Sequence, residues 1–212
     1  MYDDAGIVVI DGPPTDKSAA PCAVAIGAFA GGVQALRTII TALPADLPAA
    51  VFIVLHLDPH GRSSLPTLLA ASTRLRFRDV RDESVVESGT VYVAVPDRHL
   101  LVCDGRVQLA VSAPVHYVRP SVDRLFKSIA MSWLAAAVGV VLTGTGLDGA
   151  SGIAAIKQGG GYTIVQDPSD AEYSGMPKAA IATGAVDTVL PLAAIAPAIA
   201  RAAAIAAAGR AA

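Results

Sequence analysis

The stretch Cys22-Ala-Val-Ala-Ile-Gly-Ala-Phe-Ala-Gly-Gly-Val33 decides the fold of this chain. Its apolar run from Cys22 to Ile26 is typical of a buried strand, which we expect to stop at Gly27. Two further glycines precede a segment with helical apolar spacing, so the chain is predicted to turn sharply from strand into helix. Glycines in such a turn accept positive φ and let strand and helix approach closely. Sites in parallel α/β sheets lie at the carboxyl ends of strands, so this turn is a candidate site with Phe29 at its apex.

Strands and helices alternate along most of the chain. Buried strands are predicted at 51–55, 138–142, 162–165 and 185–190, and helices at 32–43, 65–71, 120–133, 152–158, 177–182 and 193–208. This alternation predicts an α/β fold with a doubly wound, mostly parallel sheet.

The region 74–109 has a different texture, with strand-like pieces at 75–80, 90–95, 99–103 and 106–109 separated by turn residues. Asp104-Gly105 between the last two pieces is a strong hairpin signal, so we expect an antiparallel hairpin insertion here. The predicted organisation is a flexible leader at 1–20, one domain at 21–203 and an Ala-rich frayed tail at 204–212.

The composition excludes several classes of protein. Hydrophobic residues make up 53% of the 212 residues and charged residues 16%, which excludes general disorder. The net charge of −2 gives no basic field for nucleic acid. No apolar run reaches membrane-spanning length and no signal peptide is apparent, so a cytoplasmic protein without membrane insertion is expected. Cys22 and Cys103 are expected to be free thiols, and no metal or cofactor is expected, because the histidines lack ligand spacing.

Three predicted strand ends carry polar or glycine-rich turns: 27–32, His56 and 143–149. In a parallel sheet these ends lie on one side, so His56 and Asp148 are candidates for a base and the acid that orients it. A base and an orienting acid act on a nucleophile, so a hydroxyl or thiol is expected at the apex of the first turn, where Phe29 stands. Taken singly, His56 also fits a partly buried structural histidine, Asp148 a helix cap, and Phe29 a core aromatic.

Several motifs occur in a fixed order: Ile26 to Gly32, Leu55-His56, Pro96 to Val102, Arg119 to Asp123, Leu142 to Gly149, Gln166 to Pro168 and Gly175 to Pro177. This order resembles the catalytic domain of bacterial chemotaxis receptor methylesterases, the CheB type of protein-glutamate methylesterase, from Cys22 to about residue 200. The resemblance implies a hydrolase with a Ser-His-Asp triad at the carboxyl ends of the strands. It also implies a substrate, the glutamate γ-methyl esters on cytoplasmic chemoreceptor helices, and deamidation of receptor glutamines.

Carried over by position, the resemblance makes His56 the general base, makes Asp148 its orienting acid, and puts Phe29 where the family has its serine. Ala30, Thr145 and Gly146 become candidate cleft or oxyanion residues, with Thr145 replacing a usual methionine. Substitutes for the missing hydroxyl are sought at Thr143, Thr145, Ser63 and Ser64.

The missing serine leaves two functions open, an ester hydrolase and a catalytically inactive member that binds chemoreceptors or signalling partners. The family commonly carries an N-terminal receiver domain, for which residues 1–21 are too short. The resemblance therefore implies a separate receiver or another chemotaxis protein as the regulatory partner.

Overall fold

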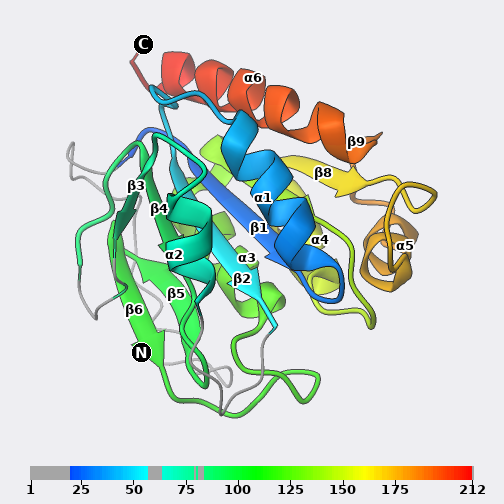
Figure 1. Cartoon of the computed structure of the whole chain (residues 1–212). Coiled ribbons are helices and arrows are strands. Elements are labelled where there is room, and N and C mark those ends of the chain that lie inside the picture. The colour runs from blue at the N-terminus through cyan, green and yellow to red at the C-terminus, as the bar shows by residue number, and fades with distance from the viewer. Residues whose placement is uncertain (1–19, 57–63, 79, 81–83, 212) are drawn as a thin grey trace.

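The computed structural model describes residues 20–56, 64–78, 80 and 84–211. Its centre is a seven-stranded parallel sheet with the strand order β3-β4-β2-β1-β7-β8-β9 (Figure 1). The predicted leader lies outside the described residues, apart from Ala20. The strands are β1 Ala23–Ala28, β2 Ala50–Leu55, β3 Arg76–Arg78, β4 Thr90–Val93, β7 Ala137–Val141, β8 Tyr162–Gln166 and β9 Thr188–Leu190.

β1 lies in the middle of the sheet, and all six of its residues are buried. Uniform burial explains why its sequence is apolar throughout instead of alternating. β1 pairs with β2 on one side and with β7 on the other, so the direction of winding reverses between β1 and β7. A crevice at the carboxyl ends is expected at such a reversal, and the turns after β1, β2 and β7 border it.

Helices cover both faces of the sheet, as a doubly wound fold requires. Residues of α1 Gly32–Ala42, α2 Leu65–Ala70 and α6 Leu192–Ala211 share one apolar core with the sheet. Residues of α3 Val122–Trp133, α4 Ala150–Gln158 and α5 Gly175–Ala182 share the other, with the short 3₁₀ turn η1 Leu134–Ala136 after α3. Figure 1 shows α1 and α2 on the near side of the strands and α3 behind them.

The antiparallel insertion is smaller than the sequence predicts. β5 His99–Cys103 and β6 Arg106–Ala110 form the expected hairpin around Asp104-Gly105 as a separate two-stranded sheet. The pieces predicted at 75–80 and 90–95 were wrongly assigned to it, because β3 and β4 extend the main sheet in parallel register. β4 is buried throughout and packs against β2, which is an environment that parallel strands require.

α6 continues to Ala211, so residues 204–211 are helical where the sequence predicts a frayed tail. Alanine is the best helix former, which favours this continuation. By length and composition alone, Leu192–Gly209 is apolar enough to span a membrane, contrary to the expectation that no apolar run reaches that length. In the structure, however, Ile195, Ile199 and Ala203 of this helix are fully buried in the sheet's core.

Gly27 does not end the first strand, as the sequence suggests, because β1 continues to Ala28. An added Cβ at Gly27 would lie 2.3 Å from Cγ1 of Val122, so glycine is needed there for the close approach of α3. The positive φ expected in this turn occurs at Gly31, with φ of 74°, directly before α1.

Candidate active site

The turns after β1, β2 and β7 bring three predicted site residues together, as the sheet geometry requires. His56 Nε2 lies 2.8 Å from Asp148 Oδ2 in a buried hydrogen bond. Only 6% of the His56 side chain and 4% of the Asp148 side chain are exposed. This contact leaves Nδ1 as the second nitrogen of the imidazole, available to act as a base.

The Asp148 carboxylate is held by the first turn of α3. Oδ1 accepts hydrogen bonds from Ser121 Oγ at 2.9 Å and from the Asp123 amide at 2.9 Å. Oδ2 accepts one from the Val122 amide at 2.7 Å, in addition to that from His56. Free amides at a helix N-terminus stabilise a negative charge.

These bonds decide the charge of Asp148. Burial raises the pKa of Asp148, but the hydrogen bonds from His56, Asp123 and Val122 outweigh it and hold the pKa below its ordinary value. Asp148 is therefore an ionised carboxylate near neutral pH, with its orientation fixed by four donors.

His99 supports this arrangement from behind, a role that the sequence did not reveal. Its Nδ1 accepts a hydrogen bond from the Ser121 amide at 3.2 Å, and its Nε2 lies 3.1 Å from the Ala113 carbonyl, to which it donates. Burial lowers the pKa of His99. A neutral imidazole with one donor and one acceptor satisfies both contacts, so His99 fixes the residue that caps α3.

Phe29 stands at the apex of the first turn, next to His56. The two ring centroids are 5.1 Å apart and the rings are tilted by 59°. Phe29 is 37% exposed, so its interpretation as a core aromatic is wrong. Its backbone is fixed in place, because its amide donates to the Thr143 carbonyl at 3.0 Å.

The candidate substitutes for the missing hydroxyl are placed differently. Thr143 is buried, and its Oγ1 donates to the Ala30 carbonyl at 3.0 Å and accepts from the Tyr173 amide at 2.9 Å. Thr145 is exposed and has no hydrogen bond to His56, and exposed Ser64 precedes α2. Ser63 lies outside the described residues. None of the three described hydroxyls is therefore bonded to the imidazole.

The candidate oxyanion residues lie around the same turns. Ala30 is partly buried beside the N-terminus of α1, while Thr145 and Gly146 are exposed. The turn that carries the latter two is tied down at its start, because the Thr143 amide donates to Gln166 Oε1 at 2.9 Å. Gln166, the first residue of the Gln166 to Pro168 motif, therefore anchors the start of the 143–149 turn.

A pocket of about 160 Å³ reaches His56 from the side of the 114–120 loop. Its wall is braced by Arg119, whose Nε donates to Asp97 Oδ1 at 2.9 Å and whose Nη1 donates to the Ser112 carbonyl at 2.8 Å. The imidazole is therefore adjacent to a small cavity although its side chain is nearly buried. The residues that line this pocket are His56, Asp97, Pro114, Tyr117, Val118, Arg119 and Pro120.

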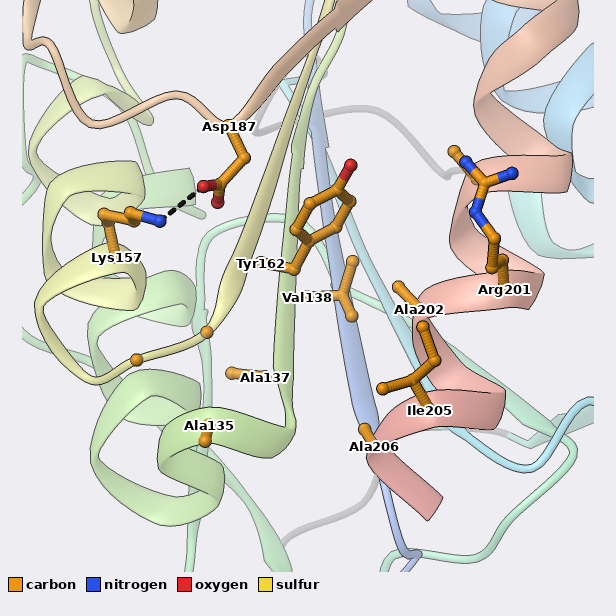
Figure 2. A pocket seen from close by; sticks show the side chains of 13 residues that line it. Ala135, Ala137, Val138, Lys157, Tyr162, Asp187, Arg201, Ala202, Ile205 and Ala206 are labelled. Atoms are coloured by element: carbon orange, nitrogen blue, oxygen red, sulfur yellow. Dashed lines mark hydrogen bonds and ion pairs between the residues drawn. The ribbon is translucent and has the colours of Figure 1, made fainter. Parts of the chain in front are cut away.

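A second pocket, of about 340 Å³, lies at the amino ends of β7 and β8 against α6 (Figure 2). Figure 2 shows the Lys157–Asp187 ion pair on one side of it and Arg201 of α6 on the other. No predicted site residue lines this pocket. Within the described ranges, no group of three His, Cys, Asp or Glu side chains is placed to hold a metal ion.

Comparison with known proteins identifies the family of the chain. The family model for the CheB methylesterase matches residues 24–199. A protein-glutamate methylesterase/protein-glutamine glutaminase from Symbiobacterium thermophilum is 44% identical over 180 residues, covering 84% of this chain and 50% of that protein. A relative with the same name from Burkholderia orbicola is also 44% identical, covering 87% of this chain and 55% of the relative. The chain therefore spans about half the length of these curated relatives.

A solved structure shows the same fold. The CheB methylesterase catalytic domain of Thermotoga maritima superposes with a TM-score of 0.81 at 34% identity, covering 85% of this chain and 97% of that domain. The shared fold and the family-model match over residues 24–199 agree with each other. We conclude that the chain belongs to the CheB methylesterase family.

Proposed function

We propose that this chain acts as a protein-glutamate methylesterase domain on glutamate γ-methyl esters of chemoreceptors. The observation that carries the proposal is the His56–Asp148 pair, with its carboxylate held by three further donors. A base with a fixed orientation beside a small cavity is suited to ester hydrolysis. The names of the relatives support the same reaction, and also hydrolysis of the glutamine amide.

In the proposed reaction a water molecule takes the place of the missing hydroxyl. His56 Nδ1 accepts a proton from this water as the water oxygen bonds to the ester carbonyl carbon. Asp148 stays ionised and stabilises the imidazolium. The tetrahedral intermediate then expels methoxide, which takes the proton from the imidazolium and leaves as methanol. The products are one glutamate side-chain acid and one methanol for each water consumed.

The rate of this route is expected to be low because Phe29 supplies no nucleophile. Loss of the serine from a protease triad costs roughly 10⁶ in kcat, and about 10³ to 10⁴ over the uncatalysed reaction remains. The Phe29 ring also occupies space beside the imidazole, 5.1 Å from it between centroids. We therefore expect slow turnover, above background but far below that of a complete triad.

Methanol release from membranes with methylated chemoreceptors tests the proposal. The chain should release methanol faster than its His56→Ala variant, which lacks the base but keeps Phe29. Equal release by the chain, His56→Ala and a sample without protein would refute hydrolysis. Deamidation of receptor glutamines, measured as ammonia release in the same samples, should follow the same order.

A second candidate function is binding without hydrolysis, and the contact between Phe29 and His56 favours it. In that case the chain would hold receptor helices, or a separate receiver or other chemotaxis protein, in the cytoplasm. Co-sedimentation with methylated receptor membranes distinguishes the two. Receptor binding with methanol release at the background rate would establish the binding function.

A further inference from the structure

The first backbone amides of α3 and of α4 are hydrogen-bonded to carboxylates: those of α3 to Asp148, and those of α4 to Asp123. Asp148, just before α4, accepts the Val122 and Asp123 amides of α3. In return, Asp123 Oδ1 accepts the Gly149 amide at 2.9 Å and the Gly152 amide at 2.7 Å, which belong to the start of α4. Asp123 of α3 therefore accepts amides at the start of α4, and Asp148 before α4 accepts amides at the start of α3, in addition to the Ser121 cap of α3.

This exchange matters most for α4, because its N-cap residue has no side chain. Gly149 has φ of 101° and provides no capping hydrogen bond, so Asp123 supplies the acceptor instead. Gly149 directly follows Asp148. The position of the Asp148 backbone therefore depends on the bond between the Gly149 amide and Asp123.

The helices are close enough for this bond to be specific. An added Cβ at Gly152 would lie 2.5 Å from Cβ of Phe126 and 3.1 Å from Cα of Asp123. Asp123 is 2% exposed, so water does not readily replace it as an acceptor. Burial raises the pKa of Asp123, and the nearby Asp148 charge adds to this effect, against the hydrogen bonds from Gly152 and Gly149.

The other carboxylate oxygen of Asp123, Oδ2, faces a third histidine, His116. His116 Nε2 lies 3.4 Å from Asp123 Oδ2, and the His116 side chain is 44% exposed. A tight turn in which the Val115 and Val118 backbones bond in both directions positions this imidazole. His116 and Tyr117, at the tip of this turn, have positive φ of 50° and 65°. Such backbone strain in non-glycine residues is found where surrounding contacts enforce it.

We propose that Asp123, partnered by His116, is a positioning residue that holds Asp148 in line with His56. Asp123 fixes the α4 amides, and His116 provides a partner for its Oδ2 at the surface. The inference rests on the proposed function, since it concerns the orientation of the acid in the same site. It is tested separately, because the His56–Asp148 hydrogen bond is observable in a protein that hydrolyses nothing.

The first readout is the proton NMR signal of the His56 Nε2–H group bonded to Asp148. Asp123→Asn keeps an oxygen that accepts the Gly149 and Gly152 amides, whereas Asp123→Ala removes it. We expect the signal to persist in Asp123→Asn and to broaden or disappear in Asp123→Ala. An unchanged signal in folded Asp123→Ala would overturn the inference.

The second readout is catalytic and uses the Phe29→Ser background. Asp123→Ala should lower kcat by about tenfold to a hundredfold, since small misplacements of catalytic groups have this cost. KM should change little, and Asp123→Asn should restore kcat to within about threefold, because it keeps the oxygen that fixes Asp148. Equal kcat losses in Asp123→Ala and Asp123→Asn would contradict the positioning role. If the Phe29→Ser background proves inactive, only the proposed function is affected, and the NMR readout still decides this inference.

Asp187 offers a matched control, because its carboxylate also accepts a backbone amide, that of Thr163 at 3.0 Å, and pairs with Lys157. Its partner Lys157 lies in the last turn of α4, at the opposite end from the amides that Asp123 accepts, so Asp187→Ala should leave both readouts unchanged even if stability falls. If Asp123→Ala does not fold, the surface variant His116→Ala replaces it. That variant should shift the His56 signal and lower kcat by at most about fivefold, because the His116 side of the contact is exposed to solvent. Where His116→Ala replaces Asp123→Ala, no change in either readout would overturn the inference.

Discussion

Phe29→Ser is the change that most directly tests what the site lacks. The backbone at position 29 does not depend on the ring, since the Phe29 amide donates to Thr143 and its carbonyl accepts from Gly32. Phe29 is 37% exposed, so losing the buried part of its side chain should lower stability by only about 1–2 kcal/mol. The variant is therefore expected to fold.

The expected gain in rate can be bounded on both sides. A complete triad gains roughly 10⁶ in kcat from its serine, or about 8 kcal/mol of barrier. One missing oxyanion donor lowers kcat by about 10² to 10³. Loss of one such donor sets the lower limit and a complete triad the upper, so we expect Phe29→Ser to gain between about 10³ and 10⁶.

The assay is methanol release from methylated receptor membranes, with protein folding confirmed by circular dichroism. Phe29→Ala is the matched control, because it removes the ring without adding an oxygen. Adding His56→Ala to Phe29→Ser should abolish the gain. A folded Phe29→Ser variant that is no faster than Phe29→Ala would refute the argument that position 29 holds the nucleophile.

Three further changes have defined outcomes. Asp148→Asn leaves a neutral amide where four donors converge, so in the Phe29→Ser background kcat should fall about 10⁴-fold, and an unchanged rate would exclude the orienting role. The pKa of His99 is lower in the folded protein than in the unfolded chain, where it is about 6.5. The stability that neutral His99 contributes is therefore fully present above about pH 6.5 and is lost as the pH falls toward the folded-state pKa. The free energy of unfolding from denaturant titrations should therefore decrease between about pH 7 and 5, by at most about 1.4 kcal/mol per pH unit, and an equally steep slope in His99→Gln would contradict this. Gly27→Ala places a Cβ 2.3 Å from Val122 Cγ1, so the free energy of unfolding should fall by about 3 kcal/mol in thermal unfolding experiments. Adding Val122→Ala should restore part of this loss, whereas wild-type stability of Gly27→Ala would show that α3 adjusts freely.

The local pattern of the sequence predicted most of the sheet and two of the site residues. Uniformly apolar runs identified β1, β2 and β7, and the rule that parallel strands end on one side brought His56 and Asp148 together. The position of the strand end near Gly27 was wrong by two residues. Gly27 was interpreted as a strand breaker, but glycine is needed there because α3 approaches closely through Val122, which is distant in the sequence.

The residues that hold Asp148 were not predictable in the same way. Ser121, Asp123 and His99 act through the placement of α3 against α4 and β5, which no local pattern encodes. The motif from Arg119 to Asp123 is the available signal, but its sequence fits a helix start and a wall of the cleft equally well. β3 and β4 were assigned to the hairpin for a related reason, because strand pairing is a property of the whole sheet.

We propose that this chain has an esterase site that lacks only its nucleophile. Reaction of Phe29→Ser with a fluorophosphonate, followed by mass spectrometry, tests this without knowledge of the receptor. We predict one adduct on the peptide that contains position 29, absent from the wild-type chain and lost when His56→Ala is added. A folded Phe29→Ser variant without an adduct, or with one that does not depend on His56, would contradict the claim.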